Sequence, residues 1–403
     1  MYKFKDDDMK VPVFSWCPNI EKNAMAQIDN LARLPFVFNR VVVMSDCHSG
    51  YGMPIGGVLA TENVILPNCV GVDIGCGMSV VKTGLIDMDK ETLKKIMGNI
   101  RKVIPVGFAH QKSNQDEELM PKIAHQWMDI PIVEKEYFNA LKQLGTLGGG
   151  NHFIEIQQGG DSHVWIMLHS GSRNLGYKVA KHYNQLAQKL CKKWYSNIPE
   201  FKGEDGLAFL PVDSDEGQAY IREMQYCVDF ALANRKLMMG RIQNIFADIF
   251  DSNDNGDRIS GIEFGDMINI AHNYVSLENH FGKNVWVHRK GATLARKGII
   301  GIIPGSQGSS SYIVEGLGNP DSFESCSHGA GRLMSRTKAK ETLNLEDEIK
   351  KMDDQGIIHG LRNKNNLDEA SSAYKDIDEV MANQSDLVKI VIKLKPLAVI
   401  KGD

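Results

Sequence analysis

The chain has 403 residues, of which 42% are hydrophobic and 24% are charged, and its formal net charge is -4 with a pI near 6.3. This composition suits a globular protein with a large core, and it lacks the strong basic excess of many nucleic-acid-binding proteins. The sequence contains no apolar stretch of about 18 residues that would suit a membrane span, and its charged N-terminus does not resemble a secretory signal. We therefore expect a cytoplasmic protein with no membrane role.

The seven cysteines do not form a disulfide framework, because their number is odd and no CxxC pair occurs. Cys69, Cys191 and Cys227 lie in apolar surroundings, and we expect them to be small core residues. Cys76 lies between two glycines and close to an aspartate, a setting that favours a functional thiol.

The first half of the chain predicts strands that lead into polar loops. Residues 40–44 (RVVVM) predict a buried strand, and the segment SDCHSGYGMPIGG that follows predicts a glycine-rich loop. Residues 70–81 repeat this mixture of apolar and glycine residues. Asp89 is expected to cap a helix whose apolar residues, from Leu93 to Ile104, share one face.

The rest of the chain predicts helices and strands in mixed order. Strands are expected at 151–156 and 164–169, where each carries a histidine at one end, and again at 285–288, 299–303 and 388–400. Helices are expected at about 175–194 and over 216–250, the latter as one or two helices. Because no repeat or linker interrupts the sequence, we expect one integrated α+β domain over residues 1–403.

Several of the best metal ligands lie beside glycines or at predicted strand ends. Asp73 and Cys76 are three residues apart, so that one tight turn would present a carboxylate and a thiolate to the same ion. His152, His169 and His272 are three further imidazoles in polar settings. A carboxylate, a thiolate and imidazoles together suit a borderline ion such as Mn²⁺, Zn²⁺ or Co²⁺.

A second group of motifs suits phosphate chemistry. Residues 304–311 (PGSQGSSS) follow a predicted strand and offer backbone N–H groups and hydroxyls, although most such runs are only turns. His328 precedes Gly-Ala-Gly, where a bulky phosphate can approach, and a neutral imidazole is a competent nucleophile toward phosphorus. Asp46 is a candidate carboxylate for orienting its ring.

One apparent calcium motif is set aside. Residues 251–263 (DSNDNGDRISGIE) resemble an EF-hand loop, but Ile262 occupies the twelfth position and the acid, Glu263, comes one residue late. We expect a solvated polar loop there.

These motifs, in this order, resemble the RtcB family of RNA-splicing ligases over nearly the whole chain. The matching stretches are SDCHSGYGMPIGG, GVDIGCGM, LGGGNHFIEI, MLHSGSRNLG, AHNY, RKGA, GIIPGSQG, SCSHGAGRLMSR, AYKDID and the late KG. The resemblance implies a single domain with a sandwich-like core of β-sheets flanked by helices. It also implies joining of RNA ends that carry a 2′,3′-cyclic phosphate or a 3′-phosphate to ends with a 5′-hydroxyl, with GTP and two Mn²⁺ ions.

The resemblance implies a role for each matching residue. Asp73, Cys76, His152, His169 and His272 would bind the two ions, with Cys76 between them, and His328 would form a histidine-GMP intermediate while Asp46 orients it. The guanylate would then pass to the RNA 3′-phosphate. The implied guanylate contacts are Asn151, His152, Phe153, Ile154, Glu155, His272, Asn273, Pro304, Gly305, Ser306, Gln307, Ser311, His328, Gly329, Ala330, Gly331, Tyr374 and Lys401. Arg173 and Arg332 are candidates for binding RNA or nucleotide phosphates.

The chain departs from the family pattern at a few positions. Ser45 replaces a proline before Asp46, which would loosen the turn that presents this carboxylate, Cys47 adds a thiol beside it, and Gln307 stands at a variable position. No metal ligand is lost. We expect an active monomeric enzyme, with an archease-type activator as a candidate partner.

Two rival functions stay open. A dinuclear metal phosphoesterase would cleave cyclic phosphates without ligation and would need neither His328 nor Lys401. A non-catalytic RNA-binding protein would show degenerate ligands and a basic surface, and the sequence shows neither.

Overall fold

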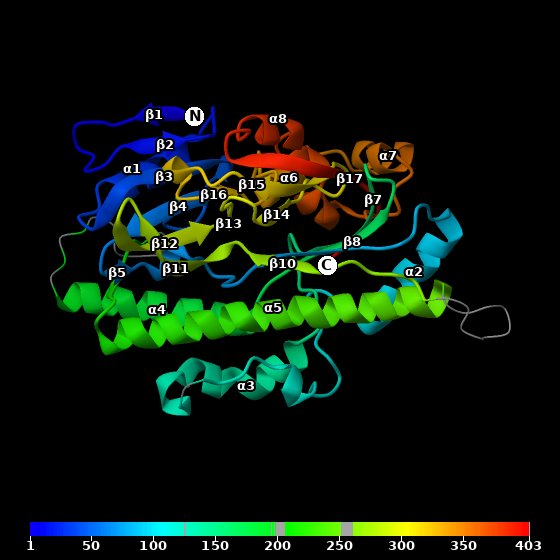
Figure 1. Cartoon of the computed structure of the whole chain (residues 1–403), viewed down its shortest axis with the longest axis horizontal. Coiled ribbons are helices and arrows are strands. Elements are labelled where there is room, and N and C mark those ends of the chain that lie inside the picture. The colour runs from blue at the N-terminus through cyan, green and yellow to red at the C-terminus, as the bar shows by residue number, and fades with distance from the viewer. Residues whose placement is uncertain (125, 195, 197, 199–205, 251–260, 403) are drawn as a thin grey trace.

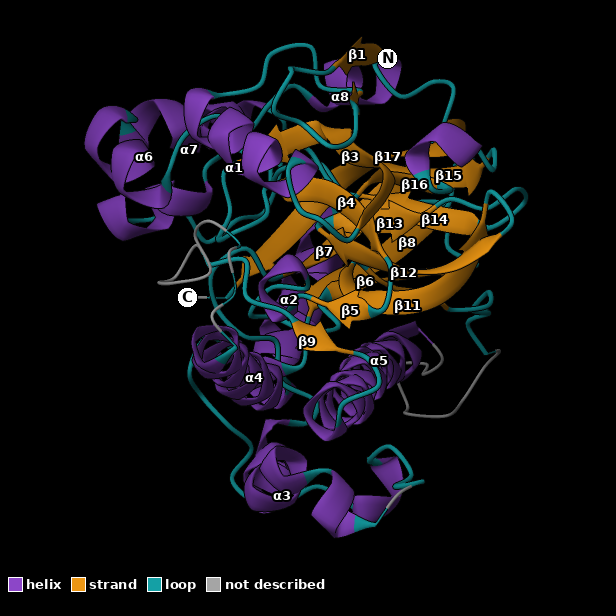
Figure 2. Cartoon of the chain, turned by 90° about the vertical axis from the view of Figure 1, so that its left-hand side faces the viewer, coloured by secondary structure: helices purple, strands orange, loops and turns teal. Residues whose placement is uncertain are grey.

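The computed structural model describes residues 1–124, 126–194, 196, 198, 206–250 and 261–402. Two large sheets occupy the centre of the described chain, with helices around them (Figure 1, Figure 2). The first sheet has the strand order β1-β2-β3-β4-β12-β11. Its strands are β1 (Tyr2–Phe4), β2 (Val13–Ser15), β3 (Val37–His48), β4 (Ile55–Thr61), β12 (Lys283–Lys290) and β11 (Asn273–His280).

The second sheet has the order β10-β6-β8-β7-β17-β15-β14. Its strands are β10 (Ile268–Ala271), β6 (Gly77–Lys82), β8 (Val164–Ser170), β7 (Phe153–Gly159), β17 (Val388–Lys401), β15 (Ser311–Gly316) and β14 (Ile300–Ile303). The edge strands β10 and β14 approach each other, so this sheet is nearly closed into a barrel. Two small ribbons complete the strands: β13 (Ala292–Leu294) with β16 (Ser325–Ser327), and β5 (Val64–Ile65) with β9 (Leu210–Pro211).

The helices cover the outside of the sheets. They are α1 (Lys22–Ala32), α2 (Lys90–Val103), α3 (Pro131–Gln143), α4 (Arg173–Lys193), α5 (Asp215–Phe250), α6 (Arg336–Thr342), α7 (Leu345–Asp354) and α8 (Ile377–Ala382). The long helices α4 and α5 run side by side along one side of the strands, and α3 lies beyond them (Figure 1, Figure 2). Residues 251–260, which follow α5 and include most of the EF-hand-like motif, lie outside the described residues.

The core explains why the two sheets face each other. One buried cluster combines Trp16, Met44 and Val58 of the first sheet and its flank with Ile303 and Val314 of the second. Because successive side chains of a strand point to opposite faces, alternate apolar residues of these strands enter this cluster, and the apolar residues between them pack into other buried clusters. A second cluster joins the same face of the seven-stranded sheet, at β6, β7 and β8, to α2 and α5, and a third cluster fills the other face. The predicted α+β class, with a sandwich-like core and flanking helices, is therefore confirmed. The division of the chain into one domain stays a prediction.

Most of the predicted elements agree with the structure. The Asp89 side chain accepts hydrogen bonds from the first N–H groups of α2, as expected for a helix cap, and residues 216–250 form one helix. Cys69, Cys191 and Cys227 are free and buried, as predicted. The prediction of a loop over SDCHSGYGMPIGG is wrong at both ends, because β3 continues to His48 and β4 begins at Ile55. Asp46 can lie within a strand because its fully buried carboxylate forms a hydrogen bond with His328, which follows β16.

Within the described residues, none of the helices has the length and apolar character required to cross a membrane. The cytoplasmic location stays a prediction.

Candidate metal centre and nucleotide pocket

The candidate metal ligands meet at one end of the seven-stranded sheet. Cys76 immediately precedes β6, His152 precedes β7, His169 lies near the end of β8, and His272 follows β10. These strands are antiparallel neighbours, so the start of one lies beside the end of the next. The His272 N–H donates to the Cys76 carbonyl and holds the two segments together at 2.8 Å.

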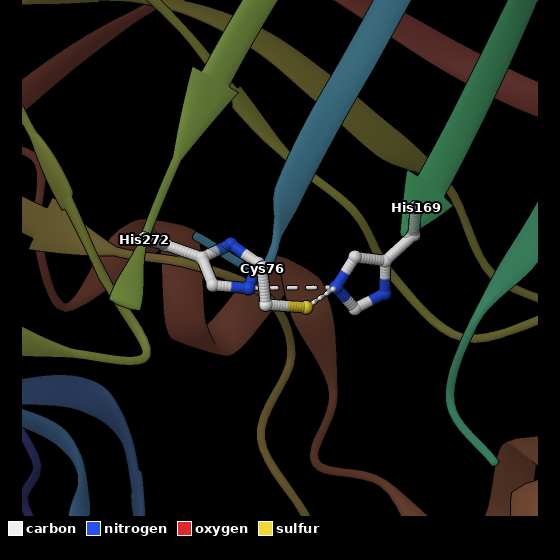
Figure 3. Close-up of side chains that lie close together, drawn as sticks. All are labelled: Cys76, His169 and His272. Carbon is white, nitrogen blue, oxygen red and sulfur yellow. Dashed lines mark hydrogen bonds between the residues drawn. The ribbon is translucent and has the colours of Figure 1, made fainter. Parts of the chain in front are cut away.

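Their side chains converge on the Cys76 sulfur. Cys76 Sγ lies 3.2 Å from His169 Nε2 and 3.5 Å from His152 Nε2. His169 Nε2 lies 3.4 Å from His272 Nε2. Figure 3 shows that the two rings approach the Cys76 thiol from opposite sides. Asp73 Oδ2 lies 3.1 Å from His152 Nε2. Two groups of possible ligands result, Cys76/His169/His272 and Asp73/Cys76/His152, and they share Cys76.

The charge states of these groups fit a cation. Burial holds the pKa of His169 and of His272 well below the ordinary value, so both imidazoles are neutral at pH 7 and keep a lone pair for a metal. Burial also raises the pKa of the Cys76 thiol well above its ordinary value, and a bound cation would favour the thiolate. The pKa of Asp73 is lowered despite its burial, because His152 hydrogen-bonds its carboxylate.

Several buried polar atoms of the ligand cluster have no hydrogen-bond partner within the described part of the chain and could bind a metal ion. Among the described residues, Asp73 Oδ1, His152 Nδ1 and His272 Nδ1 are buried and have no hydrogen-bond partner. An unsatisfied buried carboxylate oxygen costs free energy unless a cation or water pairs with it. A thiol, a carboxylate and three imidazoles therefore suit borderline divalent ions, with Cys76 placed to bind two.

A third group of possible ligands has a different character. Glu278, His280 and Glu324 lie within ligand distance of one another, but Arg289 pairs with Glu278, and Arg296 contacts Glu278 at 3.3 Å and Glu324 at 3.0 Å. Two guanidinium groups neutralise the two carboxylates. We assign this cluster a structural role.

The His328 side chain lies beside this centre and is held by Asp46. Asp46 Oδ2 accepts hydrogen bonds from His328 Nδ1 at 2.6 Å, from the His328 N–H at 3.2 Å and from the Gly329 N–H at 3.3 Å. The His328 ring packs edge-on against the His272 ring, with centroids 4.8 Å apart. Because Nδ1 donates to the carboxylate, Nε2 carries the free lone pair.

The turn after His328 fits closely against the Asp46 strand. Gly331 has φ +73°, and a Cβ there would lie 2.0 Å from the Asp46 carbonyl oxygen. Only glycine allows this approach. The Gly-Ala-Gly sequence therefore packs the His328 turn onto β3 as well as leaving room for a ligand.

Lys375 explains how the Asp46 strand stays in place without the family's proline. Its ammonium donates to the Cys47 carbonyl at 2.6 Å, the Ser45 carbonyl at 3.4 Å and Cys17 Sγ at 3.4 Å. Its backbone N–H donates to the Gly331 carbonyl at 2.9 Å. One residue therefore ties the backbone on both sides of Asp46 to the His328 turn, and the departure at Ser45 leaves no unsupported loop.

We expect the Lys375→Met variant to slow every reaction that depends on His328 by about 10- to 100-fold, because a small displacement of a catalytic group has a cost of this size. The affinity for GTP, the nucleotide that the family resemblance implies, should change much less. The measurement is a single-turnover rate of protein labelling by GTP, and the Lys375→Arg variant should recover part of it. An unchanged rate for Lys375→Met would contradict the positioning role.

A cavity of about 700 Å³ adjoins the metal cluster and contains most of the residues expected to bind nucleotide. The expected residues that line it are Asp73, Cys76, Asn151, Phe153, His169, His272, Asn273, Pro304, Gly305, Ser306, Gln307, His328, Gly329, Ala330, Gly331, Arg332, Tyr374 and Lys401. Sequence motifs from eight separate stretches therefore meet in one pocket.

A few expected residues lie behind the pocket wall. Glu155 and Ser311 are buried, and Gln157 donates to both, at 2.6 Å and 3.2 Å. Burial raises the pKa of Glu155 to about 8, against the opposing effect of the Lys401 ammonium. Ile154 is not brought to the pocket, since its side chain is fully buried in the core against α2 and α5.

The two candidate arginines are already engaged within the protein. Arg173 adopts φ +58°, and it donates to Thr146 Oγ1 at 3.1 Å and to the Gly107 carbonyl at 2.8 Å. Arg332 donates to Glu369 at 3.2 Å, to the Tyr374 hydroxyl at 3.2 Å and to two backbone carbonyls. A bidentate clamp of Arg332 on a phosphate would require some of these hydrogen bonds to break.

Three charged pocket residues received no role from the sequence. Glu369 is buried and pairs with Arg332, with Arg336 at 2.9 Å and with Lys401 at 3.7 Å. Lys290 is buried, and its ammonium donates to the carbonyls of Tyr51 and Asn68. The RKGA match contained Lys290 and the SCSHGAGRLMSR match ended at Arg336, whereas Glu369 stands in no pattern that indicates a site.

Fold and site together define an α+β protein with a shared Cys/His/Asp ligand cluster beside a carboxylate-held histidine. A family model described as tRNA-splicing ligase RtcB matches residues 27–402. The chain is 39% identical to the RNA-splicing ligase RtcB of Escherichia coli (strain K12), over 97% of each chain. It is 33% identical to the tRNA-splicing ligase RtcB of Nanoarchaeum equitans (99% of this chain, 97% of the relative) and 32% identical to the RNA-splicing ligase RtcB homolog 1 of Entamoeba dispar (98% and 86%). The chain therefore belongs to the RtcB family of tRNA-splicing ligases.

Proposed function

We propose that this chain is a GTP-dependent RNA ligase that joins a 3′-phosphate or 2′,3′-cyclic phosphate end to a 5′-hydroxyl end. The observation that carries the proposal is the Asp46–His328 pair, whose histidine packs against a candidate metal ligand, His272, and lines the nucleotide pocket. Family membership supports RNA as the substrate.

The proposed first step uses the free nitrogen of His328. Nε2 forms a bond with the α-phosphorus of GTP while the bond from that phosphorus to pyrophosphate breaks. Asp46 stabilises the positive charge that develops on the ring, because its carboxylate accepts a short hydrogen bond from the Nδ1–H group of His328. Two Mn²⁺ ions on Asp73, Cys76, His152, His169 and His272 would neutralise charge on the phosphates.

The later steps transfer the guanylate. An oxygen of the RNA 3′-phosphate attacks the guanylate phosphorus, and His328 leaves. The 5′-hydroxyl oxygen of the second RNA end then attacks the activated 3′-phosphorus, and GMP leaves as the new phosphodiester forms. A 2′,3′-cyclic phosphate must first be opened by water to the 3′-phosphate.

Guanine recognition is proposed for the pocket wall at Lys401, with Glu155 and Ser311 directly behind it. Lys401 lies over the Phe153 ring at 5.5 Å and carries a positive charge suited to the base carbonyl, and Glu155 supplies a carboxyl group suited to the N–H groups of the base. Gln157 fixes Glu155 relative to Ser311. These contacts distinguish guanine from adenine, whose hydrogen-bonding edge has the opposite pattern.

The rival function is a metal-dependent phosphodiesterase or phosphatase that acts on RNA ends without ligation. It would use the same metal ligands, but its reaction would not require the hydrogen-bonded Asp46–His328 pair. The experiment supplies RNA with a 3′-phosphate and a 5′-hydroxyl end, Mn²⁺ and either GTP or ATP, with and without an archease-type activator. A ligase gives a joined product only with GTP, whereas hydrolysis of the phosphate without joining under every condition would overturn the proposal. Size-exclusion chromatography with light scattering tests the expected monomer.

A further inference from the structure

Three exposed apolar side chains border the pocket that contains His328. They are Tyr51, Val72 and Leu333, with exposed fractions of 54%, 45% and 60%. Val72 directly precedes the candidate ligand Asp73, and Leu333 lies five residues after His328. The apolar rim formed by these three residues therefore extends from the metal cluster to the His328 turn.

Single exposed apolar residues are normal on protein surfaces, but three at the mouth of one pocket call for an explanation. The phosphates and the guanylate chemistry use the polar floor of the pocket, where Lys290, His328 and Lys401 lie. A planar base has an apolar face, which gains free energy when it stacks on an aromatic ring. The rim is thus suited to the part of an RNA substrate that the pocket floor does not bind.

The backbone of this rim is fixed while its side chains stay exposed. The Tyr51 carbonyl accepts hydrogen bonds from the Met53 N–H and from the Lys290 ammonium, and the Leu333 N–H donates to the Ala373 carbonyl at 2.8 Å. A rigid platform loses little conformational entropy when a base stacks on it. Tyr51 is the aromatic member, so it should contribute most of the stacking.

We propose that Tyr51, flanked by Val72 and Leu333, stacks against the base of an unpaired nucleotide next to the RNA end that reacts. This inference rests on the proposed ligase function and specifies which structural form of RNA the site accepts. An end held in a duplex keeps its bases stacked on each other and cannot use the rim, so the enzyme prefers single-stranded ends.

The first test measures binding of a short single-stranded RNA with a 3′-phosphate by fluorescence anisotropy, in the absence of GTP. We expect Tyr51→Ala to weaken binding by about 5- to 100-fold and Tyr51→Phe to remain within about twofold of wild type. The matched control is Tyr2→Ala, because Tyr2 is also 54% exposed but lies on β1 and does not line the pocket. Its binding should be unchanged.

The second test identifies the stacked base. A set of RNAs is made in which each RNA lacks one base near its 3′ or its 5′ end. Wild type should bind at least one of these RNAs more weakly than the intact RNA. The Tyr51→Ala variant should bind that same RNA and the intact RNA with equal affinity. In steady-state ligation, Tyr51→Ala should raise KM for RNA and leave kcat within about twofold, since stacking holds the substrate without taking part in the reaction.

The outcomes separate this inference from the function on which it rests. Labelling of the protein by GTP requires no RNA and should be the same in wild type and Tyr51→Ala. If wild type takes up no label, the ligase proposal fails, whatever the RNA-binding result. If labelling is normal but Tyr51→Ala binds RNA as tightly as wild type, or loses no more than Tyr2→Ala, the stacking role is overturned.

Discussion

We expect the His328→Ala variant to take up no label from GTP labelled at the α-phosphate. The assay should be able to detect a labelling rate of about one thousandth of the wild-type rate. Nε2 of His328 is the proposed bonding atom, and alanine provides no nucleophile in its place. The measurement is acid-labile, base-stable radioactivity in the denatured protein, because a phosphoramidate bond to histidine has this stability.

A matched variant controls for general damage. His182 is exposed on α4 and lines no part of the pocket, so His182→Ala should label as wild type does. Asp46→Asn should fold but label about 10²- to 10⁴-fold more slowly, because an amide no longer fixes the tautomer of His328. Persistent labelling of His328→Ala would assign the nucleophile to another residue.

The second large effect is expected for the Cys76→Ala variant. Cys76 belongs to both ligand groups, so its loss should weaken the binding of two ions rather than one. Loss of a residue that forms a hydrogen bond to a metal ligand lowers metal affinity or activity by about 10- to 100-fold. The effect of losing a ligand shared by two ions should exceed this range. Mn²⁺ content after gel filtration should fall below one ion per chain, and ligation should be lost with it.

Cys191→Ala is the control for Cys76→Ala. Cys191 is also free and buried, but it packs in the α4 core away from the ligand groups. Its variant should keep both ions and normal ligation, with at most a modest loss of thermal stability. If Cys76→Ala kept two ions, the thiol would not be a shared ligand.

The sequence allowed the ligand set to be chosen because most of the ligands stand next to glycine or at a strand end, a local property. Convergence of Cys76 and His272 depends on the pairing of β6 with β10, almost 200 residues apart, and only the resemblance to a family indicated it. The loop prediction around Asp46 failed for the same reason. The burial of this carboxylate depends on His328, which lies 282 residues further along the chain.

Supporting residues were harder to predict than the reacting ones. Lys375 and Glu369 act through hydrogen bonds to backbone and to other pocket residues, and a single lysine or glutamate in a sequence is most often a solvated surface residue. The exposed ring of Tyr51 has no periodic pattern either. Such roles are defined by residues that are neighbours only in the folded chain, so no local sequence pattern indicates them.

The position of β17 has a consequence for biosynthesis. Residues 388–401 form a strand between β7 and β15, in the interior of the seven-stranded sheet, and Lys401 lines the pocket. During translation, the edges of β7 and β15 therefore stay unpaired until this segment has left the ribosome. Nascent chains should thus depend on chaperones until a late moment, and a ribosome stalled before residue 388 would carry a polypeptide that lacks both this strand and Lys401.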